Sequence, residues 1–144
     1  MEVGGEPHGK FILEEVFAIG AFFKKFIVLA GGVAEGEIRV GDVLRTPDGK
    51  LLVVKGIEKR NKRVDRAVAN DRVGIHVEGL GWKPKPNDLK KYSVKKLIDR
   101  LRKEIEEKYS HMPKDARQKL VESEVKLRLK EELDKIAFKA YPHT

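Results

Sequence analysis

Cysteine is absent from the 144 residues of this chain. Its absence excludes thiol redox chemistry, zinc sites built from thiolates and a framework of disulfides. Long apolar runs are absent too: the longest, FIVLA at residues 26–30, has the length of a strand and is too short to span a bilayer. The N-terminus, MEVGGEPHGK, has no basic region followed by an apolar run, so it does not read as a signal peptide. We expect a cytoplasmic protein.

Groups that carry catalysis or bind metals are few and scattered. The four histidines, His8, His76, His111 and His143, have no metal-ligand spacing to one another. The carboxylates are interspersed with Lys and Arg, as on a solvated surface, and Glu14-Glu15 reads as a strand-edge feature rather than an acid–base pair. Because no set of catalytic roles can be assigned, we expect a protein that is not an enzyme and that uses no cofactor and no metal.

Positive charge is in excess. Lys and Arg number 31 against 23 Asp and Glu, which leaves a net charge of +8 and a pI near 9.6. Residues 1–92 and residues 93–144 each carry half of this excess. Such a balance favours polyanionic partners, nucleic acid above all. A surface rich in Lys and Glu without Cys is also typical of heat-adapted proteins, so charge alone leaves both interpretations open.

The chain changes character at about residue 92. Before it, short apolar segments with period-two alternation and glycine turns predict strands, which we place at residues 10–19, 26–34, 42–46, 51–59, 63–68 and 72–78. Short strands at regular spacing are typical of a closed antiparallel barrel. We therefore expect a mainly β protein with a helical appendage: a flexible N-terminus at 1–9, a small antiparallel barrel at 10–92 and an αα-hairpin at 93–144.

The last third of the chain has helical periodicity. Ser93 is a favourable N-cap for a first helix with apolar residues at three- and four-residue spacing from Val94 to Tyr109. Pro113 is placed to open a second helix, whose apolar stripe runs from Val121 to Ala140 and which we expect to end at Tyr141-Pro142. The two stripes need a partner, which is either the other helix, the barrel or a second copy of the chain.

Three motifs follow one another in the strand region. FILEEVFAI at 11–19 is an apolar strand with an acidic pair and Val-Phe, and IVLAGGVAEGEIRVGDVL at 27–44 is a glycine-marked hairpin ending in Ile-x-Val-Gly-Asp. VKGIEKRNKRVDRAVANDRVGIHVEGL at 54–80 joins a Gly-Ile-Glu strand, a basic loop and a Val-Gly turn. Gly36 and Gly41 are expected at the tight turns of hairpin ends. In this order the motifs resemble the second domain of translational GTPases such as elongation factor Tu and initiation factor two.

The resemblance implies a translation-factor-type β-barrel that contacts the small ribosomal subunit or the end of a charged tRNA. It does not extend to the GTPase domain. GGEPHGK at 4–10 matches a phosphate-loop pattern, but only Met-Glu-Val precedes it, and Phe11 stands where a Ser or Thr would bind magnesium. We therefore expect no nucleotide binding. Because the chain begins at Met1, we also expect no GTPase domain ahead of the barrel.

Two groups of basic residues are candidate nucleic-acid contacts. The hairpin cluster lies in KGIEKRNKRVDR at 55–66 and consists of Lys55, Lys59, Arg60, Lys62, Arg63 and Arg66. The linker cluster lies between the barrel and the helices and begins with Lys83 and Lys85, followed by Lys90, Lys91, Lys95 and Lys96. Within this link, WKPKPND at 82–88 is expected to be a stiff extended segment, because Pro84 and Pro86 both restrict their neighbours. Such groups can lie along phosphates and gain affinity from the release of counterions. The alternative is that charged residues occupy these positions only because the positions are exposed to solvent.

An aromatic loop is a third candidate. Phe22 and Phe23 stand beside Lys24 and Lys25 between the first two strands, where the family usually has a compact glycine-rich turn. Exposed phenylalanines at this place would stack on unpaired bases, whereas buried ones would cap the barrel. Trp82 is expected to pack between the barrel and the linker.

Taken as a binding module, the chain is expected to be a non-catalytic RNA- or ribosome-binding accessory protein. This expectation is carried over from the family and is an analogy. The alternative is a protein-interaction or scaffold module that forms a homodimer, or docks a protein partner, through its C-terminal helices. No membrane partner is expected.

Overall fold

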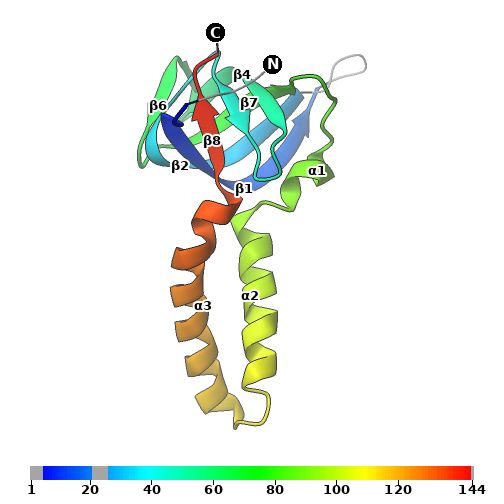
Figure 1. Ribbon diagram of the computed structural model, residues 1–144, viewed down its shortest axis with the longest axis vertical. Coiled ribbons are helices and arrows are strands. Elements are labelled where there is room, and N and C mark those ends of the chain that lie inside the picture. Colours follow the sequence, from blue (N-terminus) through cyan, green and yellow to red (C-terminus); the bar gives the residue numbers. More distant parts are fainter. Residues whose placement is uncertain (1–4, 21–25, 144) are drawn as a thin grey trace.

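A pair of antiparallel helices projects from a small β-barrel in the computed structural model, which describes residues 5–20 and 26–143 (Figure 1). Six antiparallel strands close the barrel in the order β1-β8-β3-β4-β7-β2, and β2 pairs again with β1. Their bounds are β1 Gly9–Ile19, β2 Phe26–Arg39, β3 Val43–Arg45, β4 Leu51–Lys59, β7 Arg72–Gly79 and β8 Phe138–Tyr141. The expectation of a mainly β protein with a small antiparallel barrel and a helical appendage is confirmed.

Two short strands extend the wall of the barrel. β5 (Lys62–Val64) pairs with the end of β4, and β6 (Arg66–Val68) pairs with the end of β2. The sequence predicted one strand over 63–68. It is divided at Asp65, whose carbonyl oxygen accepts a hydrogen bond from the Val40 amide at 3.0 Å, because the chain crosses there from one neighbouring strand to another.

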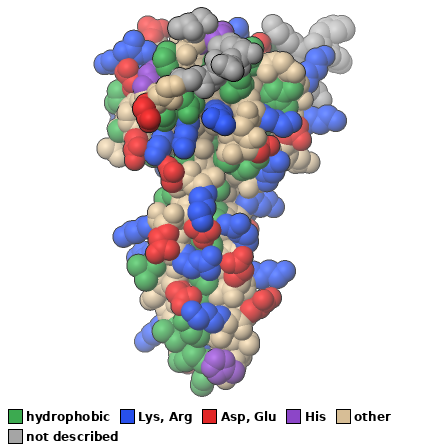
Figure 2. Space-filling view, in the orientation of Figure 1, with side chains coloured by type: hydrophobic (Ala, Val, Ile, Leu, Met, Phe, Trp, Pro, Cys, Tyr) green, Lys and Arg blue, Asp and Glu red, His purple; other side chains and the backbone are tan. Residues whose placement is uncertain are grey.

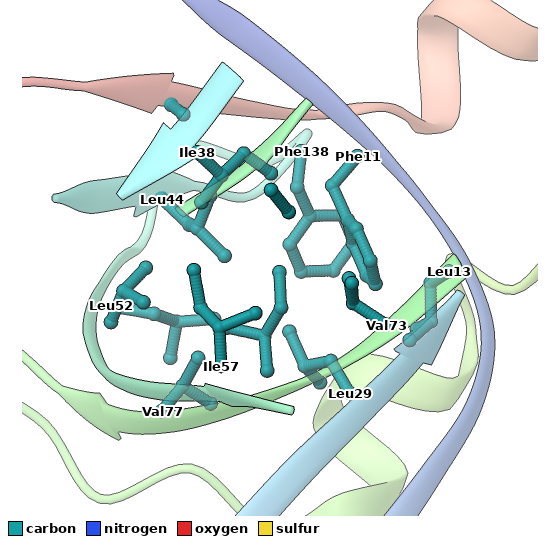
Figure 3. Packing of buried hydrophobic residues seen from close by; sticks show 14 of the residues in the cluster. Phe11, Leu13, Leu29, Ile38, Leu44, Leu52, Ile57, Val73, Val77 and Phe138 are labelled. Carbon is teal, nitrogen blue, oxygen red and sulfur yellow. The ribbon is translucent and has the colours of Figure 1, made fainter. Parts of the chain in front are cut away.

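The interior of the barrel is filled by the apolar side of each alternating strand. Figure 3 shows residues from β1, β2, β4, β7 and β8 converging on one centre, among them Phe11, Leu29, Ile57 and Phe138. Each of these four side chains is fully buried. Burial of a side chain of this size contributes roughly 1.5–3 kcal/mol. The period-two pattern of the sequence is therefore what closes the barrel.

Two glycines of the resemblance serve different purposes. Gly41 has φ +95° in the turn between β2 and β3, as predicted. The prediction for Gly36 is wrong, because this residue lies inside the long strand β2 rather than at a hairpin end. Its φ is +65°, and a Cβ there would stand 2.0 Å from the carbonyl oxygen of His8. Only glycine lets the N-terminal segment approach β2 so closely.

The helical hairpin consists of α2 (Val94–Lys108) and α3 (Lys114–Ile136). Ser93 caps α2, as predicted, and its hydroxyl accepts a hydrogen bond from the Lys96 amide at 3.3 Å. The facing stripes bury Leu97, Leu101, Ile105, Val121 and Val125 between the helices. Ion pairs also cross the hairpin, such as Arg102–Glu122 at 3.2 Å and Lys108–Glu124 at 2.9 Å. No helix of the described residues is both long and apolar enough to cross a membrane.

Two helix predictions need correction. The second helix was expected to reach Tyr141, but α3 ends at Ile136, and Ala137 is extended with φ −68° and ψ 139°. The following residues form β8, because alternate side chains Phe138 and Ala140 bury in the barrel while the backbone pairs with β1 and β3. The helical hairpin is thus an insertion between β7 and β8.

The second correction concerns the link after β7. Residues 82–88, expected to be extended throughout, run into the short helix α1 (Pro86–Lys90). Pro86 suits the first helical position, where its missing N–H has no partner to lose. Asp88 accepts a hydrogen bond from the Lys85 amide at 2.8 Å and so caps the helix. Leu89 is fully buried and joins the barrel core.

Candidate nucleic-acid interface

The hairpin cluster occupies the tip of the β4–β5 hairpin. Arg60 and Asn61 both have positive φ, 53° and 64°, in the loop between the two strands. A two-residue loop with two positive φ values matches the right-handed twist of its flanking strands. Arg60, Asn61 and Lys62 are exposed, so the tip presents charge to solvent.

Half of the hairpin cluster is neutralised by carboxylates. Lys59 donates to Asp71 Oδ1 at 2.7 Å, the Nε of Arg63 lies 3.5 Å from Glu58, and the Nη1 of Arg66 lies 3.4 Å from Glu37. The remaining three members form no ion pair with any residue in the described part of the chain; they are Lys55, Arg60 and Lys62. The positive field of this hairpin is weaker than its sequence suggests.

The linker cluster lies against the beginning of β4. Trp82 anchors the linker, because its Nε1 donates to the Leu51 carbonyl oxygen at 2.7 Å and its ring packs on the barrel core, as expected. Lys50 Nζ stands 4.6 Å from the centre of the Trp82 ring, within reach of a cation–π contact. Lys83 and Lys85 are exposed on either side of Pro84.

The two predicted clusters do not form one surface. The linker meets β4 at Leu51, whereas the hairpin tip follows Lys59, at the other end of the same nine-residue strand. At ~3.3 Å per residue, the strand separates them by roughly 26 Å. Phe22, Phe23, Lys24 and Lys25 lie outside the described residues. The contact role of every predicted residue therefore stays a prediction.

Basic residues that the sequence did not group together meet the linker cluster at the root of the helical hairpin. We call residues 45–50, 82–96 and 134–139 the junction surface. They hold ten Lys and Arg against three Asp, a net charge of +7 on a chain whose total is +8. Figure 2 shows Lys and Arg side chains where the barrel meets the helices, with some Asp and Glu among them, and a mixture of both signs along the hairpin.

Two cavities hollow the junction surface, and Thr46 lines both. The first, of about 410 Å³, lies between β3, β8 and the end of α3 and is lined by Arg45, Lys135 and Lys139 among others. The second, of about 280 Å³, lies beside the linker and is lined by Lys50, Lys83 and Lys91 together with the rings of Trp82 and Tyr92. The shared residue makes the three segments one continuous surface.

The three carboxylates of the junction surface are already engaged. Asp48 accepts a hydrogen bond from the Thr46 hydroxyl and lies 3.9 Å from Lys91 Nζ. Asp88 caps α1, and Asp134 accepts a hydrogen bond from Lys10 Nζ at 2.6 Å. Burial, followed by the neighbouring Asp48 carboxylate, raises the pKa of Tyr92, so its hydroxyl stays neutral at physiological pH. Lys135 lies 3.9 Å from Glu132, and the remaining basic groups form no ion pair with any residue that the structure describes; they are Arg45, Lys50, Lys83, Lys85, Lys90, Lys95, Lys96 and Lys139.

Among the described residues, no three His, Asp or Glu side chains gather closely enough to hold a metal ion. Four cavities in the described part of the chain, of about 280 to 660 Å³, are each lined mainly by polar side chains.

Comparisons with known proteins support the resemblance of the barrel region to translation factors. No protein-family model matches the chain. Elongation factor 1-alpha from Sulfolobus acidocaldarius is 30% identical over 69 residues, which are 47% of this chain and 15% of that protein. The barrel is related to translation elongation factors. The resemblance that the sequence motifs indicated is thereby confirmed for about half of the chain.

Solved structures give similar matches. The apo form of translation elongation factor SelB from Methanococcus maripaludis is 29% identical, covers 55% of this chain and 17% of its own length, and has a TM-score of 0.45. A bacterial selenocysteine-specific elongation factor, EF-Sec, is 20% identical, with coverages of 58% and 13% and a TM-score of 0.47. The chain spans less than a fifth of the length of these relatives, so their activities are not transferred to it.

Proposed function

We propose that this protein is a non-catalytic RNA- or ribosome-binding accessory protein of translation, and that it binds through the junction surface. The observation that carries the proposal is the concentration of charge: 27 of the 144 residues hold +7 of the net +8. A surface of this kind attracts phosphates and releases the counterions condensed on RNA. The relation of the barrel to translation elongation factors supports RNA of the translation machinery as the polyanion.

The direct test is binding of the full chain to isolated ribosomal subunits and to tRNA across a salt series. We expect affinity to fall steeply as salt rises, because each neutralised phosphate contributes about −0.7 to −0.9 to the logarithmic slope. Absence of binding at low salt, or binding with no salt dependence, removes the proposal.

A charge-matched pair of variants locates the binding surface. Lys83→Gln, Lys85→Gln and Lys90→Gln remove three exposed cations of the junction surface. Lys103→Gln, Lys119→Gln and Lys126→Gln remove three exposed cations of the helical hairpin and give the same net charge. We expect the first triple variant to lose at least about tenfold in affinity and the second to lose little. Equal losses in both would show that only the overall charge matters.

A protein-interaction role through the helices is the second candidate. The stripe that motivated it is largely satisfied within the chain, because Val121 and Val125 pack on α2 and Ala140 lies in β8. Two leucines on the outer side of α3 remain: Leu120 and Leu127, seven residues apart, are 41% and 62% exposed. Light scattering separates the candidates. A dimer that Leu127→Lys converts to monomer supports this role, and a wild-type monomer opposes self-association.

A further inference from the structure

Three basic residues stand in a row across neighbouring strands of the barrel. Lys10 of β1 pairs with Lys139 of β8, and Lys139 pairs with Arg45 of β3. All three lie on the outer face, because the residues that follow or precede them, Phe11 and Phe138 among them, point into the core. Directly opposed side chains have their Cβ atoms about 4.5–5.5 Å apart, and like charges at that separation destabilise a sheet.

The row is only partly compensated by acids. Lys10 donates to Asp134 at 2.6 Å and lies 3.4 Å from Glu35. The hydrogen bond from Lys10, and then the charges of Lys10 and Lys139, lower the pKa of Asp134, so this carboxylate is ionised at neutral pH. Lys139 and Arg45 form no ion pair with any residue that the structure describes. Asp134 is hydrogen-bonded to Lys10 and also lines the same cavity, where its charge acts on Lys139. One carboxylate therefore stands against three cations of the row and cavity wall, Lys10, Lys139 and Arg45.

Arg45 and Lys139, the two members of the row that form no ion pair with a described residue, line the cavity of about 410 Å³ between the barrel and α3. Lys135 of α3 lines the cavity from the helical side, although it also lies 3.9 Å from Glu132. The cavity owes its existence to the insertion, because α3 passes into β8 through the single residue Ala137. Groups from the barrel and from the inserted hairpin therefore converge on one space.

We propose that this cavity binds a phosphate group, held by Arg45 and Lys139 from the barrel and Lys135 from α3. A guanidinium presents a fork of donors to phosphate oxygens, and ammonium groups add point charges. A bound phosphate would also offset the repulsion between Lys139 and Arg45, because its negative charge attracts both side chains. In the case of an RNA phosphate this inference rests on the proposed function, whereas a free phosphomonoester offers the same chemistry without it.

Thermal unfolding of the full chain tests the pocket. We compare inorganic phosphate with sodium chloride at matched ionic strength for the wild type, Arg45→Gln, Lys139→Gln and the control Lys126→Gln on the outside of α3. Phosphate is expected to raise the midpoint of the wild type and of the control, and to leave both pocket variants unchanged. Calorimetric titration is expected to show at least about a tenfold loss of phosphate affinity in each pocket variant. An equal rise in all four proteins, or a rise in none, overturns the proposal.

A second arm separates the sources of the phosphate. A short single-stranded RNA replaces inorganic phosphate as the probe. Loss of RNA affinity in Lys139→Gln, with retention in Lys126→Gln, assigns the pocket to RNA. Specific binding of inorganic phosphate without RNA binding keeps the pocket and removes the proposed function. If the Lys83, Lys85 and Lys90 triple variant loses RNA binding and Lys139→Gln retains it, the proposed function stands and RNA is not the source of the phosphate. The inorganic-phosphate measurements then decide whether the pocket exists.

Discussion

Phe11 of β1 and Phe138 of β8 meet edge to face inside the barrel, with their ring centroids 6.4 Å apart. Tyr92, which precedes the cap of α2, meets Phe138 in the same way at 6.0 Å. The first strand, the last strand and the link to the helices are therefore packed on one ring. The hairpin is attached to the barrel at both of its ends, and the barrel is complete only when the chain has passed through the hairpin and returned.

Truncation of Phe138 is the first prediction from this arrangement. Phe138→Ala removes a fully buried ring at the place where the barrel closes, and we expect the free energy of unfolding to fall by about 3–5 kcal/mol. Leu127→Ala is the control, because its side chain is 62% exposed, and it is expected to cost under ~1 kcal/mol. Urea denaturation followed by fluorescence of Trp82 measures both. A small loss in Phe138→Ala would mean that β8 is dispensable.

The Asp71 carboxylate predicts how stability changes with pH. The hydrogen bond from Lys59 at 2.7 Å, followed by that from the Val68 amide at 2.9 Å, lowers the pKa of Asp71. A carboxyl group whose pKa is lower in the folded chain contributes stability above its unfolded pKa, and this contribution is lost as pH falls through the folded pKa. We therefore expect Asp71→Asn to unfold more easily at neutral pH and to lose less stability on acidification than the wild type does.

Urea denaturation at neutral pH and at about pH 2 measures this difference. Asp99→Asn removes an exposed carboxylate of α2 that has no ion pair within the described residues, and it serves as the control. Its pH dependence should follow that of the wild type. Parallel pH profiles for Asp71→Asn and Asp99→Asn would contradict the role assigned to the Lys59–Asp71 pair.

Substitution of His76 is predicted to raise the free energy of unfolding, whereas the substitutions above are predicted to lower it. Its Nε2 is buried without a hydrogen-bond partner among the described residues, and the nearest Glu58 oxygen is 3.7 Å away. A buried polar atom without a partner costs about 1–3 kcal/mol. We expect His76→Leu to raise the free energy of unfolding by about 1 kcal/mol at neutral pH, measured from the urea midpoint. A lower midpoint in this variant would show that the nitrogen is satisfied in solution.

The local sequence pattern was sufficient to predict most strands of the barrel and the first residue of the helical hairpin. Alternation placed β1, β4 and β7 within a residue of their observed bounds, and the Ser93 hydroxyl marked the first residue of α2. It was not enough for β8, because Ile136 and Ala140 fit a helical stripe as well as Phe138 and Ala140 fit a strand. The pairing of β8 with β1 and β3, remote in the chain, decides between the two.

In the candidate interface, too, some residues could be found from a local sequence signal and others only from the pairing of distant strands. Lys83 and Lys85 were found because they lie in a run of charge, which is a local signal. Arg45 and Lys139 were missed because each is a single basic residue in its own segment. Only the register between β3 and β8 brings them together, and that register depends on the strand that the sequence did not reveal.

The salt dependence of RNA binding tests the central claim most directly. The claim is that the junction surface, rather than the chain's overall charge, makes the phosphate contacts. The logarithm of affinity for single-stranded RNA is measured against the logarithm of salt concentration for the wild type and for the two triple variants. We predict a slope that is shallower by about 2 when Lys83, Lys85 and Lys90 are neutralised, at about 0.7 per lost contact. An unchanged slope in that variant, or an equal change when Lys103, Lys119 and Lys126 are neutralised, would contradict the claim.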